Sequence, residues 1–194
     1  ILRPGIEARF RRDLDLFRWA ARVMERARPD LKRLKPREVV ETIAQSVELE
    51  MDLRFEAAAA AEMADNFAGD DTFVIPAVDW ARTGSRVLTT ERIDGFPIND
   101  VEGIIAAGID PKTVVENAAR AFFNQVFRDG FFHADLHPGN LFVMDGGAIG
   151  AVDFGIIGRI GMTERRFLAE ILWGFLKRDY LRVAEVHFEA GYVP

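Results

Sequence analysis

A short segment in the second half of the chain has side chains that could transfer a phosphoryl group. The segment from His133 to Asn140 reads His-Ala-Asp-Leu-His-Pro-Gly-Asn, and Asp153 later opens an Asp-Phe-Gly tripeptide. Phosphoryl transfer from a nucleotide needs a group that orients the acceptor hydroxyl, and oxygen ligands that hold Mg²⁺ on the phosphates. We therefore expect Asp135 to orient the acceptor, and Asn140 and Asp153 to bind magnesium.

The histidines of this segment allow a second interpretation. His133 is expected to brace the loop, and His137 to touch a phosphate when protonated or to face solvent. Imidazole and carboxylate groups are also good zinc ligands, so His133, Asp135 and His137 could form a metallohydrolase site. That site would need further ligands, and His187 is the only other histidine. The spacing favours phosphoryl transfer.

A second acidic group lies in residues 37–67, a segment rich in alanine and glutamate that predicts one long helix. Glu48, Asp52 and Glu56 follow one another at spacings of four, so on a helix they share a face, whereas Glu50 lies off it. Like charges stacked in this way repel one another, and a lysine or a metal ion would relieve the repulsion. A solvated acidic face explains the pattern equally well.

The elements around these groups are mostly helices. Residues 6–28 repeat apolar residues at spacings of three and four with arginines between them, which is typical of an amphipathic helix. Pro29 and Asp30 interrupt it, and Pro36 lies where the next helix could begin. Further helices are predicted at residues 99–107, from Asp110 onward, from about 162 to 178, and at 180–190. The helix after Asp110 should lie centrally because of an apolar stripe, formed by Val114, Val115, Ala118, Ala119, Phe122, Phe123, Val126 and Phe127.

Short strands are predicted at residues 72–75, 78–81 and 86–92, with a turn at 83–85. Residues 141–144 and 148–152 flank Asp-Gly-Gly and predict a hairpin. Residues 94–97 read Asp-Gly-Phe-Pro and suggest a hinge between two lobes, at residues 1–94 and 95–194. Just before this hinge, backbone groups near Glu91 and Ile93 are expected to meet an adenine ring. The fold class is therefore expected to be α+β.

Composition limits the class of protein. The 194 residues are 49% hydrophobic, which is enough for a core, and the absence of cysteine excludes disulfides and thiolate chemistry. No apolar run approaches the ~18–20 residues of a membrane-spanning helix, and no signal-peptide core is present. The chain opens at Ile1 as if in mid-strand, so we expect a soluble fragment of a larger protein.

Charge is unevenly distributed along the chain. The net charge is −6, yet residues 1–37 hold twelve Lys or Arg and five Asp or Glu. A solvated, arginine-rich helix face is the simpler explanation, and contact with anionic lipid is the alternative. As a hypothesis, the helix at 6–28 contacts a membrane surface or a partner through its basic face while its apolar stripe packs inside. No nucleic-acid-binding motif accompanies these residues.

Taken together, the chain resembles the UbiB-like family of atypical kinases, which is linked to ubiquinone and other prenylquinone biosynthesis. Besides the two catalytic motifs, the resemblance rests on Glu50-Met-Asp52 followed by Glu56, on the helix after Leu2-Arg-Pro-Gly5, and on residues 153–160. It implies a bilobal protein kinase-like fold, with a truncated N-lobe that carries a helical insert and a mostly helical C-lobe. It also implies that ATP and Mg²⁺ are the cofactors.

The same resemblance assigns roles outside the catalytic loop. Glu56 should pair with a nucleotide-binding lysine and Glu50 with a lysine of a K-x-G-Q extension, both expected upstream of Ile1. Asp52 and His137 should lie near the nucleotide. This fragment would then lack half of the ATP cradle and be inactive alone. The implied partners are a nucleotide, a prenylquinone precursor or lipid, and a peripheral membrane contact, in the cytoplasm at the inner membrane.

Two alternatives remain open. Aminoglycoside and choline phosphotransferases use a similar His-x-Asp-x-His-Pro-x-Asn loop on small molecules, but lack the acidic helix and the basic insert. The other alternative is a pseudoenzyme that holds a lipid precursor or a biosynthetic complex at the membrane. The sequence disfavours a protein-kinase role, because no Ala-Pro-Glu segment follows Gly155 to build the usual substrate platform.

Overall fold

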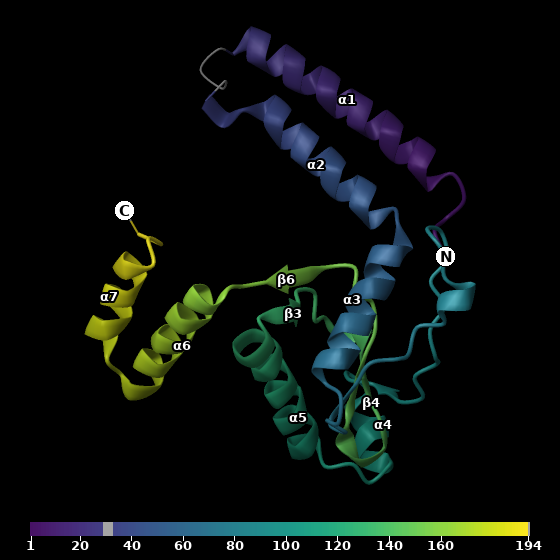
Figure 1. Cartoon of the computed structure of the whole chain (residues 1–194), viewed down its shortest axis with the longest axis vertical. Helices are drawn as coiled ribbons and strands as arrows, with labels where there is room; N and C mark the ends of the chain where they lie inside the picture. The colour runs from purple at the N-terminus through teal and green to yellow at the C-terminus, as the bar shows by residue number, and fades with distance from the viewer. Residues whose placement is uncertain (29–32, 194) are drawn as a thin grey trace. The chain divides into compact units, whose positions relative to one another are not determined.

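The computed structural model describes residues 1–28 and 33–193 (Figure 1). The chain divides into two compact units, one formed by Ile1–Ala59 with Ala77–Glu91 and the other by Ala60–Pro76 with Arg92–Pro194. Helices predominate and short strands accompany them, which confirms the α+β class. The lobe boundary near residue 94 stays a prediction.

The first unit begins with two long helices, α1 (Ile6–Ala27) and α2 (Pro36–Glu50), which lie side by side in Figure 1. The Arg18 guanidinium joins them by donating from Nε and Nη2 to the two carboxylate oxygens of Glu41, each at 3.0 Å. The first helix was predicted, and Pro36, where the next helix was expected to begin, is the first residue of α2. The predicted interruption at Pro29 and Asp30 lies outside the described residues.

The apolar stripe of α1 is only partly buried, contrary to the expectation that it packs inside. Leu14 and Ala21 are buried, whereas Phe17 and Met24 are 50% and 42% exposed. The stripe is wider than the contact that one neighbouring helix can cover.

The predicted single helix over residues 37–67 was wrong, because α2 ends at Glu50 and a new helix, α3 (Leu53–Asn66), follows. Asp52 lies between them, and its Oδ1 accepts a hydrogen bond from the backbone N–H of Arg54 at 3.1 Å. An aspartate that pairs with a free N–H of the first turn favours a new helix start over continuation. Glu48, Asp52 and Glu56 therefore do not share one helix face.

Two strands predicted for the first unit were also wrong. Trp80–Arg82 forms a 3₁₀ helix whose N-terminus is capped by Asp79, which accepts from the Arg82 N–H at 3.1 Å. Thr83 Oγ1 accepts from the Thr89 N–H at 3.1 Å. Such side-chain bonds compete with a strand ladder. What remains of the ladder is two isolated bridges, between Val78 and Thr90 and between Gly84 and Val87.

The second unit contains both sheets. One has the order β1-β5-β4-β2, formed by Phe73–Val74, Ile149–Ala151, Leu141–Val143 and Phe96–Pro97. β4 and β5 are antiparallel and confirm the predicted hairpin, and β1 pairs with β5 in parallel. The other sheet pairs β3 (Phe131–His133) with β6 (Ile157–Arg159). β1 is a shorter form of the strand predicted at residues 72–75.

The helices of the second unit confirm the predicted ones. They are α4 (Val101–Ala106), α5 (Pro111–Phe123), α6 (Met162–Lys177) and α7 (Tyr180–Glu189). Asp110 caps α5, since its Oδ1 accepts from the Lys112 N–H at 2.9 Å. None of the helices in the described residues is long and apolar enough to cross a bilayer.

The predicted buried face of α5 was partly wrong. Val114, Asn117 and Ala121 are its buried residues, while Val115, Phe122 and Phe123 are exposed. Val115, Ala118 and Ala119 instead line an apolar cavity of about 380 Å³ together with α4. Asn117 can be buried because its Nδ2 donates to the Gly147 carbonyl oxygen at 2.9 Å, so the face includes an amide that an apolar pattern omits.

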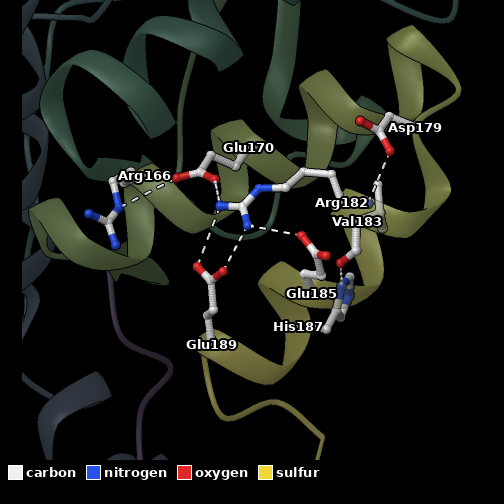
Figure 2. Close-up of polar contacts among 8 residues, drawn as sticks. All are labelled: Arg166, Glu170, Asp179, Arg182, Val183, Glu185, His187 and Glu189. Atoms are coloured by element: carbon white, nitrogen blue, oxygen red, sulfur yellow. Dashed lines mark hydrogen bonds and ion pairs between the residues drawn. The ribbon is translucent and has the colours of Figure 1, made fainter.

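A network of charges joins α6 to α7 (Figure 2). The Arg182 guanidinium of α7 contacts Glu170 of α6, and it also contacts Glu185 and Glu189 of its own helix. Bonds from these carboxylates, with Glu189 contributing most, raise the pKa of Arg182. The network fixes the two helices as a hairpin.

Candidate phosphoryl-transfer site

The pairing of β3 with β6 brings the two catalytic motifs together. His133 lies opposite Ile157 in the register, and the Ala134 N–H donates to the Ile156 carbonyl oxygen at 2.9 Å. The loop that leaves β3 therefore runs beside the segment that enters β6. Residues far apart in sequence reach one place through this short ladder.

His133 connects the two motifs. It is 2% exposed, and its Nδ1 accepts from the Asp135 N–H at 3.2 Å. Because a backbone N–H can only donate, Nδ1 carries no proton, and Nε2–H is then the donor to the Val152 carbonyl oxygen at 3.3 Å. Phe154 packs on the ring, with centroids 5.4 Å apart. The histidine thus braces the loop as a neutral ring.

Asn140 lies between Asp135 and the second motif. It is 6% exposed, and its Nδ2 donates to the Asp135 carbonyl oxygen at 3.3 Å. Its own carbonyl oxygen accepts from the Val152 N–H at 2.9 Å, next to Asp153. With the amide nitrogen engaged, the side-chain oxygen of Asn140 is the end that could hold a cation.

Asp153 has an unusual backbone conformation. Its φ is 64°, in the left-handed region, which costs a residue other than glycine on the order of 1 kcal/mol or more. Its Oδ1 accepts from the Gly155 N–H at 3.4 Å, and the following Phe154 is buried. Strain of this kind accumulates at functional sites, where the surrounding structure holds it in place.

His137 stands at the exposed side of the loop. Its Nδ1 accepts from the Gly139 N–H at 3.0 Å at the start of the 3₁₀ helix Pro138–Asn140. Its Nε2 lies 4.0 Å from Asp135 Oδ2, and both side chains are about half exposed. The Asp135 carboxylate and the His137 ring therefore face solvent together.

The donor set fits magnesium better than zinc. Mg²⁺ prefers oxygen ligands and is commonly held by one or two protein groups together with substrate phosphates, which Asn140 and Asp153 can complement. Both ring nitrogens of His133 bind backbone groups, so the histidine cannot also bind zinc. In residues 1–28 and 33–193, no three His, Cys, Asp or Glu gather as a metal cluster.

The remaining predicted site residues lie mostly in the first unit. Glu50 ends α2, Asp52 directly precedes α3, and Glu56 lies in the first turn of α3. The Glu91 N–H donates to the Ala77 carbonyl oxygen at 2.9 Å, so this backbone donor is already paired. Ile93 belongs to the second unit, with its methyl groups against Gly150. The second unit itself gathers Asp135, His137, Asn140 and Asp153.

One residue of the site was missed at the sequence level. Gln125 is fully buried, and its Oε1 accepts from the His133 N–H at 2.9 Å. It lies in a π-helix, Asn124–Asp129, that extends α5. The available signal was a glutamine four residues after the buried Ala121, on the same face as Asn117.

Comparisons with known proteins identify the family of this chain. Residues 1–187 match the family model described as "ABC1 atypical kinase-like domain". Proteins named "Probable protein kinase UbiB" are 43% identical over 199 residues in Marinobacter nauticus and 41% identical over 198 residues in Aeromonas salmonicida. Each alignment covers 100% of this chain and 36% of the relative.

A similar solved structure is that of Rv3197 from Mycobacterium tuberculosis in complex with erythromycin. The TM-score is 0.63 at 25% identity, over 90% of this chain and 45% of that one. The resemblance inferred from the catalytic loop and the acidic helix is confirmed, as is the kinase-like fold. This chain belongs to the UbiB-like family of atypical kinases that carry the ABC1 domain.

Proposed function

We propose that this chain forms the phosphoryl-transfer core of a Mg-ATP-binding atypical kinase or ATPase that supports ubiquinone or related prenylquinone biosynthesis. The observation that carries the proposal is the position of Asn140, which is bonded to Asp135 through its side chain and to Val152, beside Asp153, through its main chain. The biosynthetic role rests on the UbiB relatives.

The proposed roles follow from the chemistry of each side chain. Magnesium, when bound, would neutralise charge on the phosphate oxygens. Asn140 and Asp153 would hold it, and the Asp135 carboxylate would orient the acceptor hydroxyl. The His137 Nε2 lies 4.0 Å from an oxygen of that carboxylate. Glu56 is proposed to position a nucleotide-binding lysine, and the segments near Glu91 and Ile93 to meet the adenine.

The test is nucleotide titration of the full-length protein. Asp153→Asn should abolish magnesium-dependent nucleotide binding, because it removes the anionic ligand. Asp145→Asn is the matched control, since Asp145 is an exposed aspartate at the tip of the hairpin. Unchanged affinity in Asp153→Asn contradicts the proposal.

A small-molecule phosphotransferase is the second candidate, favoured by the likeness to a structure that contains erythromycin. Phosphate transfer to a small hydroxylated compound, absent in Asp135→Asn, would support it. If instead Asp135→Asn still restores quinone synthesis in a deficient strain, the site serves a binding scaffold. Loss of complementation counts against the scaffold.

A peripheral membrane contact is also proposed, with α1 as the contacting element at the cytoplasmic side of the inner membrane. Arg12, Leu16, Trp19, Val23 and Arg26 follow one another at spacings of three and four, so they form one stripe along the helix. Leu16 and Trp19 are 58% and 57% exposed. Apolar side chains between arginines suit an anionic lipid surface.

A further inference from the structure

We infer that Gln125 is a positioning residue of the candidate site: it fixes the backbone where β3 enters the catalytic loop and thereby sets the place of Asp135. The expected effect on turnover rests on the proposed function. The effect of Gln125 on the conformation of the loop does not depend on that function. Gln125 lies outside the catalytic motifs, eight residues before His133.

The first step is the backbone of His133. Within the described residues, β3 belongs to a sheet of two strands, so β6 covers one of its edges. A backbone N–H at the other edge, buried and unpaired, would cost about 1–3 kcal/mol. The Gln125 Oε1 accepts a hydrogen bond from the His133 N–H at 2.9 Å, and so pairs this N–H as the carbonyl oxygen of a third strand would.

The second step is the side chain of His133. Once its backbone is held, the ring joins two distant segments of the candidate site, through the Asp135 N–H at 3.2 Å and the Val152 carbonyl oxygen at 3.3 Å. Asp135 lies two residues after His133, and Val152 directly precedes Asp153. A shift of His133 would therefore move both halves of the candidate site.

The third step is the amide of Gln125 itself. The residue is 0% exposed, and in the part of the chain that the structure describes its Nε2 has no hydrogen-bond partner. A buried, unpaired amide N–H is unfavourable, so the residue contributes through its oxygen. A π-helix, which inserts an extra residue in the turn and is frequent at functional sites, presents this side chain.

Asn117 provides a matched control. It is a second buried amide on the same face of the helix, and it binds the Gly147 carbonyl oxygen in the hairpin instead of the loop. Asn117→Leu and Gln125→Met each remove one buried side-chain bond to the backbone. Only Gln125→Met should disturb the catalytic loop.

The experiment measures amide hydrogen exchange and ATP turnover in the full-length protein. Gln125→Met should raise exchange at His133 and Asp135 at least tenfold and lower kcat by about tenfold to a hundredfold, as small misplacements of reacting groups do. Asn117→Leu should change neither the exchange at His133 and Asp135 nor kcat, even if it lowers the urea midpoint as much as Gln125→Met does. Gln125→Glu keeps an oxygen acceptor and should restore the protection of the His133 amide.

Two results would overturn the inference. One is unchanged exchange at His133 in folded Gln125→Met, and the other is an equal rise at this amide in Asn117→Leu. If the protein has no ATP turnover, the exchange measurement still decides the role of Gln125, and only the proposed function fails.

Discussion

The side-chain amide of Asn140 donates to the main-chain carbonyl oxygen of Asp135 at 3.3 Å, and this bond closes the candidate catalytic loop on itself. The bond directs the amide nitrogen inward, so that the amide oxygen points the other way. A residue proposed to bind magnesium is thus also a structural part of the loop, and its substitution should affect both properties.

Asn140→Ala should lose magnesium-dependent nucleotide binding and about 1 kcal/mol of unfolding free energy, since it removes one buried hydrogen bond. Asn140→Asp keeps oxygen ligands but replaces the N–H donor by a carboxylate that faces the Asp135 carbonyl oxygen. We expect it to keep part of the nucleotide affinity while losing stability. Isothermal titration and urea unfolding separate the two effects. Full stability in both variants would show that the loop does not depend on this bond.

Arg182→Met should weaken the α6–α7 hairpin, because it leaves Glu170, Glu185 and Glu189 close together without their shared cation. Urea unfolding at two salt concentrations measures this, and the loss should be smaller at high salt, where repulsion is screened. Arg166→Met is the control, since the Arg166 ion pair with Glu170 is longer, at 3.6 Å, and its guanidinium also lies over the Phe167 ring. Equal losses in the two variants would contradict the importance of the network.

The parts of the fold that were predicted correctly depend on local chemistry. The hairpin follows from its Asp-Gly-Gly turn, and α5 begins at Pro111 with Asp110 as its N-cap, whose side chain accepts from the Lys112 N–H. The order of Asp135, Asn140 and Asp153 predicts one site, since a short hairpin separates the last two, and the roles of these residues stay a prediction. The turn and the cap each lie within a few residues of the element that they predict.

The parts that were missed depend on distant or competing bonds. Asn117 and Gln125 are buried because they bind backbone groups elsewhere in the fold, so the apolar pattern of α5 identified only part of the buried face. Asp52 interrupts a segment of high helix propensity because its side chain caps a new helix. The conformation of Asp153 is held by its surroundings and has no signal in the sequence.

The pair between Glu62 of α3 and Arg159 of β6 gives a pH dependence. Arg159 donates from Nη1 and Nη2 at 2.7 and 2.5 Å, and these bonds lower the pKa of Glu62. Because the pKa of Glu62 is lower in the folded than in the unfolded state, the ion pair stabilises the fold fully above the pKa of an unfolded glutamate, about 4.3. This stabilisation is lost as the pH falls through the pKa of Glu62 in the folded protein. The amplitude should be small, because both side chains are substantially exposed.

Glu62→Gln should therefore be less stable than the wild type at pH 7, and the two should converge as the pH falls below about 4. Arg159→Gln should lose the same pH-dependent part, since Glu62 then titrates as an unpaired glutamate. Urea midpoints measured from pH 3 to pH 7 would show this. If the difference in urea midpoint between wild type and Glu62→Gln grows toward acid pH, the ion pair does not stabilise the fold through a lowered pKa of Glu62.

The stripe on α1 leads to the last prediction. Leu14 and Ala21 are buried, and Leu16 and Val23 each follow one of them by two positions, which on a helix of 3.6 residues per turn faces them away from the buried side. Trp19 lies between them on the exposed stripe, with Arg12 and Arg26 at its ends. The full-length protein should therefore float with vesicles that contain phosphatidylglycerol more than with neutral phosphatidylcholine vesicles.

Trp19→Ala should reduce this flotation, because it removes the largest apolar group of the stripe, and Gln substitutions at Arg9, Arg11 and Arg12 should abolish the preference for anionic lipid. Trp173→Ala is the matched control, since Trp173 is a comparably exposed tryptophan on α6, 60% against 57%. If both tryptophan variants lose flotation equally, the contact is not specific to α1. If neither the lipid charge nor Trp19 changes flotation, α1 is a solvated helix and the membrane contact lies elsewhere or does not exist.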